Sequence, residues 1–376
     1  MVTQNSGGAV VTNTSADLSG TNAKGNFSIA GGSASNMLLE NDGYLTVYSG
    51  HQASDTTVGS SGTLKVRSGG NAIETTIISG GRLQVEAGGS ASMVTQNSGG
   101  AVVTNTSADL SGTNAKGNFS IAGGSASNML LENGGSLTVL NGHQATGTTI
   151  NSGGDMMVEG IATDTTINSN GLLHVSSGGS VTGTIVNNGG RENINSGGSA
   201  TSTTLNSGGI QAVSSGGNAL NASVNDGGRQ YLYAGNATKT TVNNGGRQYV
   251  SSGGSATKTT VNSGGRQHVY KNGNVTETII MDGGRLQVEA GGSASMVTQN
   301  SGGAVVTNTS ADLSGTNAKG NFSIAGGSAS NMLLENDGYL TVYSGHQASD
   351  TTVGSSGTLK VRSGGNAIET TIISGG

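Results

Sequence analysis

The sequence of 376 residues predicts an all-β fold in which the chain winds as a parallel β-solenoid. Three observations predict it. Glycine pairs recur in steps of 17, 18 or 19 residues along nearly the whole chain. Between them, apolar residues stand at every second position, which is the alternation of a β-strand. With 69 Gly, no Pro and 3% aromatic residues, the chain cannot fill one large core, but it can build a thin continuous one.

The unit that begins at Gly246 shows the pattern of one solenoid turn, here called a rung. The phrases QYV and TTV alternate like strands, and the residues expected to face inward are Gln248, Val250, Ala256, Thr259 and Val261. The step from Ala256 to Thr259 breaks the alternation and predicts a corner. Three short strands joined by corners make a rung that buries its apolar side only against the neighbouring rungs, about 4.8 Å away. Repeated glycines make a helix unfavourable.

The same counting predicts a single continuous solenoid fragment over residues 1–376, with about 20 rungs of 17–19 residues. Irregular rungs are expected near 9–43, 101–135 and 304–338, where NTSADLSGTNAK is expected to form a loose corner. Residues 1–81 are identical to 296–376. That identity indicates either duplication of a gene segment or assembly of the chain from repeated pieces.

Asparagine precedes many of the glycine corners. Stacked at one position on successive rungs, the amides could bond to one another along the solenoid axis, which is a structural role. The residues in this series are Asn151, Asn168, Asn187, Asn206, Asn225, Asn243 and Asn262.

Two outward columns follow the glycine pairs in the second half of the chain. The residues that we assign to a self-association or ligand stripe are Arg191, Arg229, Arg247, Arg266, Arg285, Tyr231 and Tyr249. Stacked arginines would repel one another by roughly 1 kcal/mol per pair in water. One interpretation is a solvated face in which each guanidinium packs on its neighbours. The other is a stripe that binds anions or a partner.

Serine and threonine fill two further outward positions, at the corner inside each rung and on its last strand. These residues suit exposed strands and corners in any case. The functional alternatives are O-glycosylation, hydrogen-bonded pairing with another solenoid, or a flat threonine array that orders water.

Catalytic or metal-binding chemistry is not expected, and neither is a cofactor. Three of the five histidines recur in the repeated phrase GHQA, and no metal-binding spacing is present. Asp155, Glu159, Asp164 and Glu192 fall within a few rungs and are a candidate carboxylate cluster, with Glu192 at the position that usually holds Gln. A net charge of −5 makes nucleic-acid binding unlikely. No segment here is expected to insert into a membrane or to act as a signal peptide.

Two long phrases carry a resemblance to a known family. They are SGGSATKTTVNSGGRQHV and the irregular stretch from Arg82 to Gly135, which begins RLQVEAGGSASMVTQNSGGAVV. The chain resembles the passenger domain of the AIDA/TibA-type self-associating autotransporter adhesins over nearly its whole length. The resemblance implies a right-handed parallel β-helix with three short strands per rung.

The resemblance also implies a function and partners. The expected function is that of a structural adhesin, not an enzyme, which mediates bacterial autoaggregation, biofilm formation and adhesion to host cells. The expected partners are copies of the chain on neighbouring cells, the host-cell surface and a heptosyltransferase. The expected location is extracellular, on the outer membrane, after glycosylation in the cytoplasm. The acceptor candidates are Ser177, Ser180, Ser199, Ser252, Ser255, Thr204, Thr241 and Thr260.

Two other functions remain as alternatives at this stage. A polysaccharide-degrading solenoid enzyme would need a non-repeating carboxylate cluster in a groove. An ice-binding solenoid would need unbroken ranks of threonine, whereas Ile185 and Ile279 interrupt the column of outward threonines.

Overall fold

The computed structural model describes residues 1–376 as 56 short β-strands without any helix. The prediction of an all-β parallel solenoid of about 20 rungs is confirmed. The chain forms two compact units, Met1–Thr184 and Ile185–Gly376, and each is described by itself. No helix is present that could cross a membrane. The expectation of one continuous solenoid stays a prediction.

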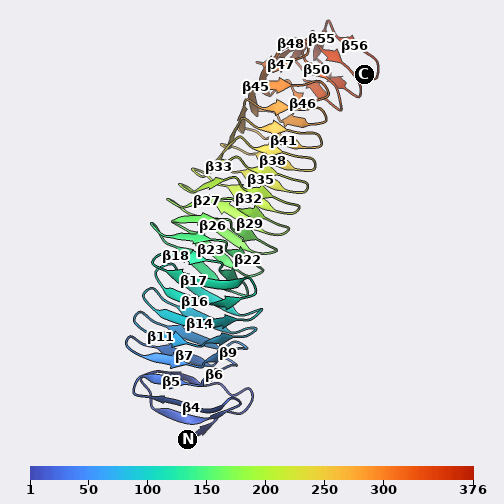
Figure 1. Cartoon of the computed structure of the whole chain (residues 1–376). Coiled ribbons are helices and arrows are strands. Elements are labelled where there is room, and N and C mark those ends of the chain that lie inside the picture. The colour runs from blue at the N-terminus through green and yellow to red at the C-terminus, as the bar shows by residue number, and fades with distance from the viewer. The chain divides into compact units, whose positions relative to one another are not determined.

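A regular rung of the second unit has three strands, as predicted. Strand β38 (Arg247–Val250) is followed by β39 (Ser255–Thr257) and β40 (Thr260–Val261). Each pairs in parallel with the corresponding strand of the next rung. These partners are, in order, β41 (Arg266–Val269), β42 (Asn274–Thr276) and β43 (Ile279–Ile280). The register has no slip, so equivalent residues of successive rungs lie opposite one another. Figure 1 shows β35, β38 and β41 stacked in that order.

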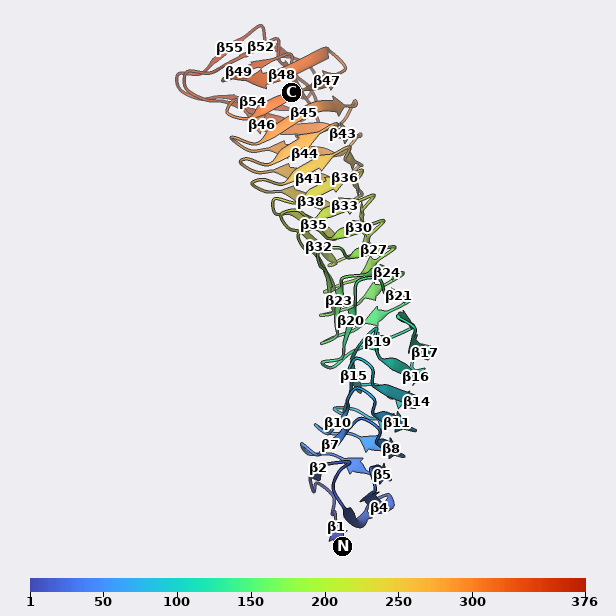
Figure 2. The ribbon, with the colours of Figure 1, turned by 90° about the vertical axis from the view of Figure 1, so that its left-hand side faces the viewer.

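The first strands of successive rungs form one ladder in each unit. In the first unit these strands are β2 (Val11–Asn13), β7 (Tyr44–Val47), β10 (Thr63–Val66), β13 (Arg82–Val85), β15 (Ala101–Asn105), β20 (Ser136–Val139), β23 (Asp155–Val158) and β26 (Leu172–Val175). In the second unit they are β29 (Arg191–Ile194), β32 (Ile210–Val213), β35 (Arg229–Leu232), β38, β41, β44 (Arg285–Val288), β46 (Ala304–Asn308), β51 (Tyr339–Val342) and β54 (Thr358–Val361). Figure 2 shows β32, β35, β38, β41 and β44 stacked in that order.

The inward residues were predicted correctly. Gln248, Val250, Ala256 and Val261 are completely buried, and Thr259 is 1% exposed. Burial depends on the neighbouring rung. Ile77, which has a rung on each side, is 0% exposed, whereas the identical residue of the last rung, Ile372, is 69% exposed.

The corners use backbone conformations with positive φ. The predicted corner between Ala256 and Thr259 lies at Lys258, whose φ is 58°, and Glu277 occupies the same place one rung later with φ of 56°. Such φ values are uncommon for residues other than Gly, Asn and Asp. The many glycines at other corners avoid this strain.

The predicted asparagine ladder is present at another corner. Each amide nitrogen donates to the amide oxygen of the previous rung, so the ladder stabilises the stacking of rungs. In the second unit the bonds are Asn206 to Asn187 at 2.9 Å, Asn225 to Asn206 at 3.3 Å, Asn243 to Asn225 at 2.9 Å and Asn262 to Asn243 at 2.8 Å. In the first unit, Asn168 donates to Asn151 at 2.9 Å.

The irregular blocks differ from the prediction of a loose corner. Residues 109–114, within NTSADLSGTNAK, form a strand, β16 (Asp109–Asn114), and this strand pairs in antiparallel fashion with β17 (Gly117–Ala122). β17 in turn pairs with β18 (Ser125–Ser127), also antiparallel. The chain therefore runs back on itself within one long excursion and then resumes the parallel stack at β18. The expected loose corner was wrong because alternation in this block continues beyond the point where a corner was placed.

The same antiparallel strands occur in the other copies of the block. They are β3 (Leu18–Asn22), β4 (Gly25–Ala30) and β5 (Ser33–Ser35) in the first unit, and β47 (Asp312–Asn317), β48 (Gly320–Ala325) and β49 (Ser328–Ser330) in the second. A close approach explains one glycine in this arrangement. A Cβ on Gly112 would lie 2.9 Å from the ring of Phe119, which is only 2% exposed.

Candidate functional site

The arginine column is formed by the first residues of four consecutive strands in the second unit. The register places Arg229 opposite Arg247, Arg247 opposite Arg266, and Arg266 opposite Arg285. Neighbouring strands are about 4.8 Å apart, so the guanidinium groups project from a closely spaced row. The predicted stacking of these arginines is confirmed. Arg191 is separated from the row by Ile210 and donates from Nε to Asn193 Oδ1 at 2.7 Å.

The four stacked arginines have no acidic partner within ion-pair distance. The ion pairs of the chain involve Lys65, Lys258 and His268 instead. Partial burial lowers the pKa of the Arg285 guanidinium, the like charge of Arg266 lowers it further, and Asp337 opposes both. Arginine stays protonated at neutral pH in spite of such shifts. The row is therefore a concentration of positive charge that the protein itself does not neutralise.

A cluster of aromatic rings lies beside the arginine column. The rings of Tyr231 and Tyr249 stack at 4.9 Å between centroids, with an angle of 11° between their planes. Tyr233 stacks on Tyr231 at 5.7 Å, and Tyr270 stacks on His268 at 4.1 Å. Partial burial raises the pKa of the Tyr270 phenol, and Tyr249 and Glu289 add to the effect. The phenol therefore stays protonated and can donate a hydrogen bond.

Two members of this aromatic cluster were missed in the sequence. Tyr233 and Tyr270 each come directly after a strand, at the first corner residue, and the alternation of the strand does not extend to them. Their spacing could have indicated them, because Tyr233 stands two residues after Tyr231 and Tyr270 stands two residues after His268.

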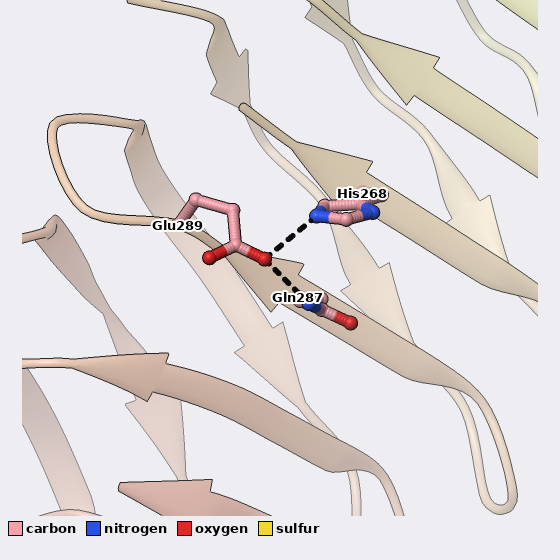
Figure 3. A network of polar contacts seen from close by, with 3 residues as sticks. All are labelled: His268, Gln287 and Glu289. Atoms are coloured by element: carbon pink, nitrogen blue, oxygen red, sulfur yellow. Dashed lines mark hydrogen bonds and ion pairs between the residues drawn. The ribbon is translucent and has the colours of Figure 1, made fainter. Parts of the chain in front are cut away.

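A carboxylate fixes the end of the aromatic column that is nearer the C-terminus. Glu289 Oε1 lies 2.9 Å from His268 Nε2 and accepts a hydrogen bond from Gln287 Nε2 at 2.6 Å (Figure 3). The figure shows both side chains turned toward the same carboxylate oxygen. Glu289 thus orients one residue of each of two successive rungs.

Two hollows lie on this face and share one residue. The first has a volume of about 110 Å³ and is lined by Arg247, Arg266, Arg285 and Tyr249, among others. The second is a more open depression of about 460 Å³, and its lining residues are Tyr231, Tyr233, Tyr249, Ser251 and Tyr270. Tyr249 belongs to both. A cationic hollow and an aromatic hollow therefore adjoin at Tyr249, and together they form what we call the Arg–Tyr face.

A second polar column lies inside the solenoid and was not foreseen as a ladder. Gln230, Gln248 and Gln267 each donate from Nε2 to the Oε1 of the preceding Gln, at 2.6–2.7 Å. Gln211 begins the series by donating to Glu192 Oε2 at 2.7 Å. All five side chains are completely buried. Buried amides that are bonded to one another in this way satisfy their polar atoms and fix the register of the rungs.

Threonines complete this internal ladder. Thr203 donates to Glu192, Thr240 to Gln230, Thr259 to Gln248 and Thr278 to Gln267. The column at Glu192 is therefore part of the core. The other carboxylates that were considered with it, Asp155, Glu159 and Asp164, are exposed or half-buried in the first unit. No group of three or more His, Cys, Asp or Glu residues could hold a metal ion.

The glycosylation candidates lie on the outside. Ser177 and Ser252 are exposed at corners, and the other six candidates are half-buried on strands. In the second unit, Thr241 lies opposite Thr260 on adjacent rungs. The candidates form columns and do not converge on one place. No observation distinguishes which of them carry a modification, so all eight stay predictions.

Comparison with known proteins shows which family has this arrangement. The family described as "Adhesin of bacterial autotransporter system, probable stalk", abbreviated AIDA, matches residues 19–81, 111–171, 231–281 and 314–376. The chain belongs to this family. These ranges cover more than half of the chain and occur in both units.

Individual relatives of the AIDA-family chain match shorter segments. The autotransporter adhesin/invasin TibA of Escherichia coli O78:H11 (strain H10407 / ETEC) is 77% identical over 43 residues, which is 11% of this chain and 4% of TibA. The autotransporter CRAC of Citrobacter rodentium (strain ICC168) is 77% identical over 44 residues, which is 12% of this chain and 3% of CRAC. The matches therefore span a small part of either relative.

A solved structure resembles the chain more broadly. It is a TibA fragment described as hyper-glycosylated in a reaction catalysed by TibC. It has a TM-score of 0.56 and 52% sequence identity, and the match covers 73% of this chain and 97% of the fragment. The resemblance to a TibA-type passenger domain is thus confirmed in both sequence and fold.

Proposed function

We propose that this chain is the stalk of an adhesin displayed on the outside of a bacterial cell, where it holds cells to one another and to host cells. Its membership of the AIDA family is the observation that carries the proposal. The architecture supports it, because stacked rungs present the same side chains again and again along one face. Many weak contacts along such a face add up to strong attachment.

Autoaggregation and biofilm formation follow from lateral pairing of two such stalks. The outer columns are polar, with arginines, threonines and serines at regular intervals. Each hydrogen bond or charge contact between two stalks would be weak and could form or break by itself. We propose the threonine and serine columns for this pairing, and the arginine column with Tyr231 and Tyr249 as a stripe that binds a ligand or a partner.

O-heptosylation is the second part of the proposal. The similar TibA fragment is hyper-glycosylated by TibC, which supports a glycosyltransferase as partner of this chain. We place the acceptors among the eight outward serines and threonines named above, because a hydroxyl must be accessible to be modified. Transfer would take place in the cytoplasm before export.

The experiment displays the chain on cells with and without a heptosyltransferase, and measures how fast a cell suspension settles. We expect clumping to require the displayed chain, and peptide mass spectrometry to find heptose on some of the eight candidates. A variant in which the eight candidates are replaced, Ser by Ala and Thr by Val, should carry less heptose than the parent chain. Cells that settle at the same rate with and without the chain would contradict the adhesive role.

A further inference from the structure

We infer that the Arg–Tyr face binds an acidic polysaccharide, with its anionic groups at the arginine column and its sugar rings on the tyrosines. This goes beyond the proposed stalk and adhesion function, since it assigns one ligand class to one set of side chains. It also does not depend on pairing between copies of the chain.

The anionic part of the ligand has a suitable place in the smaller hollow. Arg247, Arg266 and Arg285 line it, and none of them is neutralised by an ion pair. The planar guanidinium fork donates two parallel hydrogen bonds to a carboxylate or sulfate group. A bound anion would also relieve the repulsion between neighbouring arginines, which are held together by the strand register.

The sugar part has a suitable place in the larger depression. Tyr233 and Tyr270, which are 48% and 39% exposed, offer apolar ring surface in this depression beside the half-buried Tyr231 and Tyr249. The tyrosine hydroxyl groups offer hydrogen bonds at its edge. A sugar ring has a matching apolar C–H face and polar rim. Because the tyrosines already stack on one another, little side-chain freedom is lost when a ligand binds.

The repeat along the solenoid favours a polymer over a single sugar. Arginine recurs on four successive rungs, at intervals of about 4.8 Å. One ring of an extended polysaccharide advances by a similar length, so neighbouring sugars meet neighbouring rungs. The binding of each sugar then raises the local concentration of the next.

A second copy of this chain is a poorer fit to the Arg–Tyr face. Such a partner would need a column of carboxylates at the same spacing. On the strands of either unit, no two acidic residues lie opposite one another. At the corner after them, Asp55 with Glu74 and Asp350 with Glu369 form acidic pairs on two adjacent rungs, which is shorter than the row of four arginines. Asp337 acts electrostatically on Arg285 without reaching ion-pair distance, and Glu289 is held by His268 and Gln287 at the end of the face, so neither carboxylate fills the arginine hollow.

The experiment uses the purified chain, made without a glycosyltransferase, and measures its affinity for polygalacturonate, heparin and neutral dextran. We expect polygalacturonate or heparin to bind, dextran not to bind, and affinity to fall as salt screens the charges. Polygalacturonate alone would identify carboxylate as the anionic group, and heparin alone would identify sulfate.

The variants test the named residues. The triple change Arg247→Gln, Arg266→Gln and Arg285→Gln should weaken binding by about tenfold or more, and Tyr231→Ser with Tyr249→Ser should also weaken it. The matched control is Arg82→Gln, which lies at the same strand position in the first unit and should bind like the parent. Circular dichroism checks that each variant keeps its β-structure.

Three results would overturn the inference. One is no binding of either acidic polysaccharide at low salt. Another is equal binding of dextran. The third is an arginine triple variant that keeps its affinity but loses self-association in the settling assay, which would assign the face to a second copy. Because binding uses the isolated chain, its failure is distinguishable from failure of the proposed adhesion.

Discussion

Residues 82–92 of the first unit and 285–295 of the second both read RLQVEAGGSAS, and the strands they form differ in surroundings. β13 pairs with β10, so that Arg82 lies opposite Thr63 and Gln84 opposite Lys65. β44 pairs with β41, so that Arg285 lies opposite Arg266 and Gln287 opposite His268.

The glutamate that follows each strand shows the consequence. Glu86 makes an ion pair with Lys65 at 2.7 Å, whereas Glu289 binds His268 and Gln287. The same residues thus make an ordinary charged surface in one place and the end of a cation-rich, aromatic face in the other. In a solenoid, the chemistry of a surface belongs to the column of neighbouring rungs and cannot be read from one repeat.

The largest effect is expected when a charge is placed in the core, and it should be equal at β13 and β44. Val85 and Val288 are each 1% exposed, and each is the last residue of a strand that reads RLQV. Val85→Asp or Val288→Asp would bury a carboxylate without a partner, at a cost on the order of 3 kcal/mol or more. Hydrogen exchange measured by mass spectrometry should show that backbone amides of the substituted rung and its neighbours lose protection in both variants.

The control for that pair is Gln84→Asp, at an outward position of the first strand, which should leave protection nearly unchanged. A large difference between the two valine variants would break the comparison, because it would mean that the two cores are not equivalent.

The internal ladder distinguishes the two units in a different way. The inward position that holds Gln248 in the second unit holds Leu64 in the first. Gln248→Leu should destabilise its rungs by about 1–3 kcal/mol, because it removes the acceptor of Gln267 and Thr259. Leu64→Met, a swap of similar volume, should cost less than about 1.5 kcal/mol. Hydrogen exchange of the two rungs checks the difference, and equal protection in both variants would show that the amide ladder is energetically unimportant.

A transplant sharpens the comparison of surfaces. Thr63→Arg with Lys65→His gives β10 the outward residues of β41, next to an unchanged β13. We expect the first unit to gain affinity for acidic polysaccharide by only a few-fold, because two arginines would be stacked instead of four and the nearby Tyr48 packs against His51 and not against a tyrosine. Titration with polygalacturonate, on a background in which Arg247, Arg266 and Arg285 are Gln, measures the gain. No gain would show that stacked arginines alone are insufficient.

The smallest effect is expected at the ion pair that only the first unit has. Lys65→Met removes the partner of Glu86, whose side chain is 38% exposed. Exposed ion pairs contribute about 0–1 kcal/mol, so local protection should change little. A loss as large as that of Val85→Asp would show that this surface is more important to folding than its exposure indicates.

Periodicity was sufficient to predict the regular rungs. Val250 and Val261 could be placed inside from alternation alone, and the corner at Lys258 from the point where alternation breaks. The asparagine ladder could also be predicted, because one residue type recurs at one position of the repeat. These features depend on local spacing, which a single sequence contains.

Other features depend on what lies opposite and were predicted only in part. The antiparallel course of β16 and β17 could not be deduced, since alternating residues suit a strand of either direction. Tyr233 and Tyr270 join the aromatic cluster from a corner, where the direction of a side chain depends on the backbone. The hydrogen bonds among the buried glutamines needed the stacking of rungs to be known first.

Disulfide formation between engineered cysteines tests the stacking of rungs most directly, because the chain contains no cysteine of its own. Thr241 and Thr260 lie opposite each other on adjacent rungs. Their Cα atoms should be about 4.8 Å apart, within the range of about 4.4–6.8 Å that a disulfide needs. After mild oxidation, mass spectrometry should find an intramolecular bond in Thr241→Cys with Thr260→Cys, and none in Thr241→Cys with Ser263→Cys. Equal yields in the two variants, or a bond only in the second, would contradict the register on which every column depends.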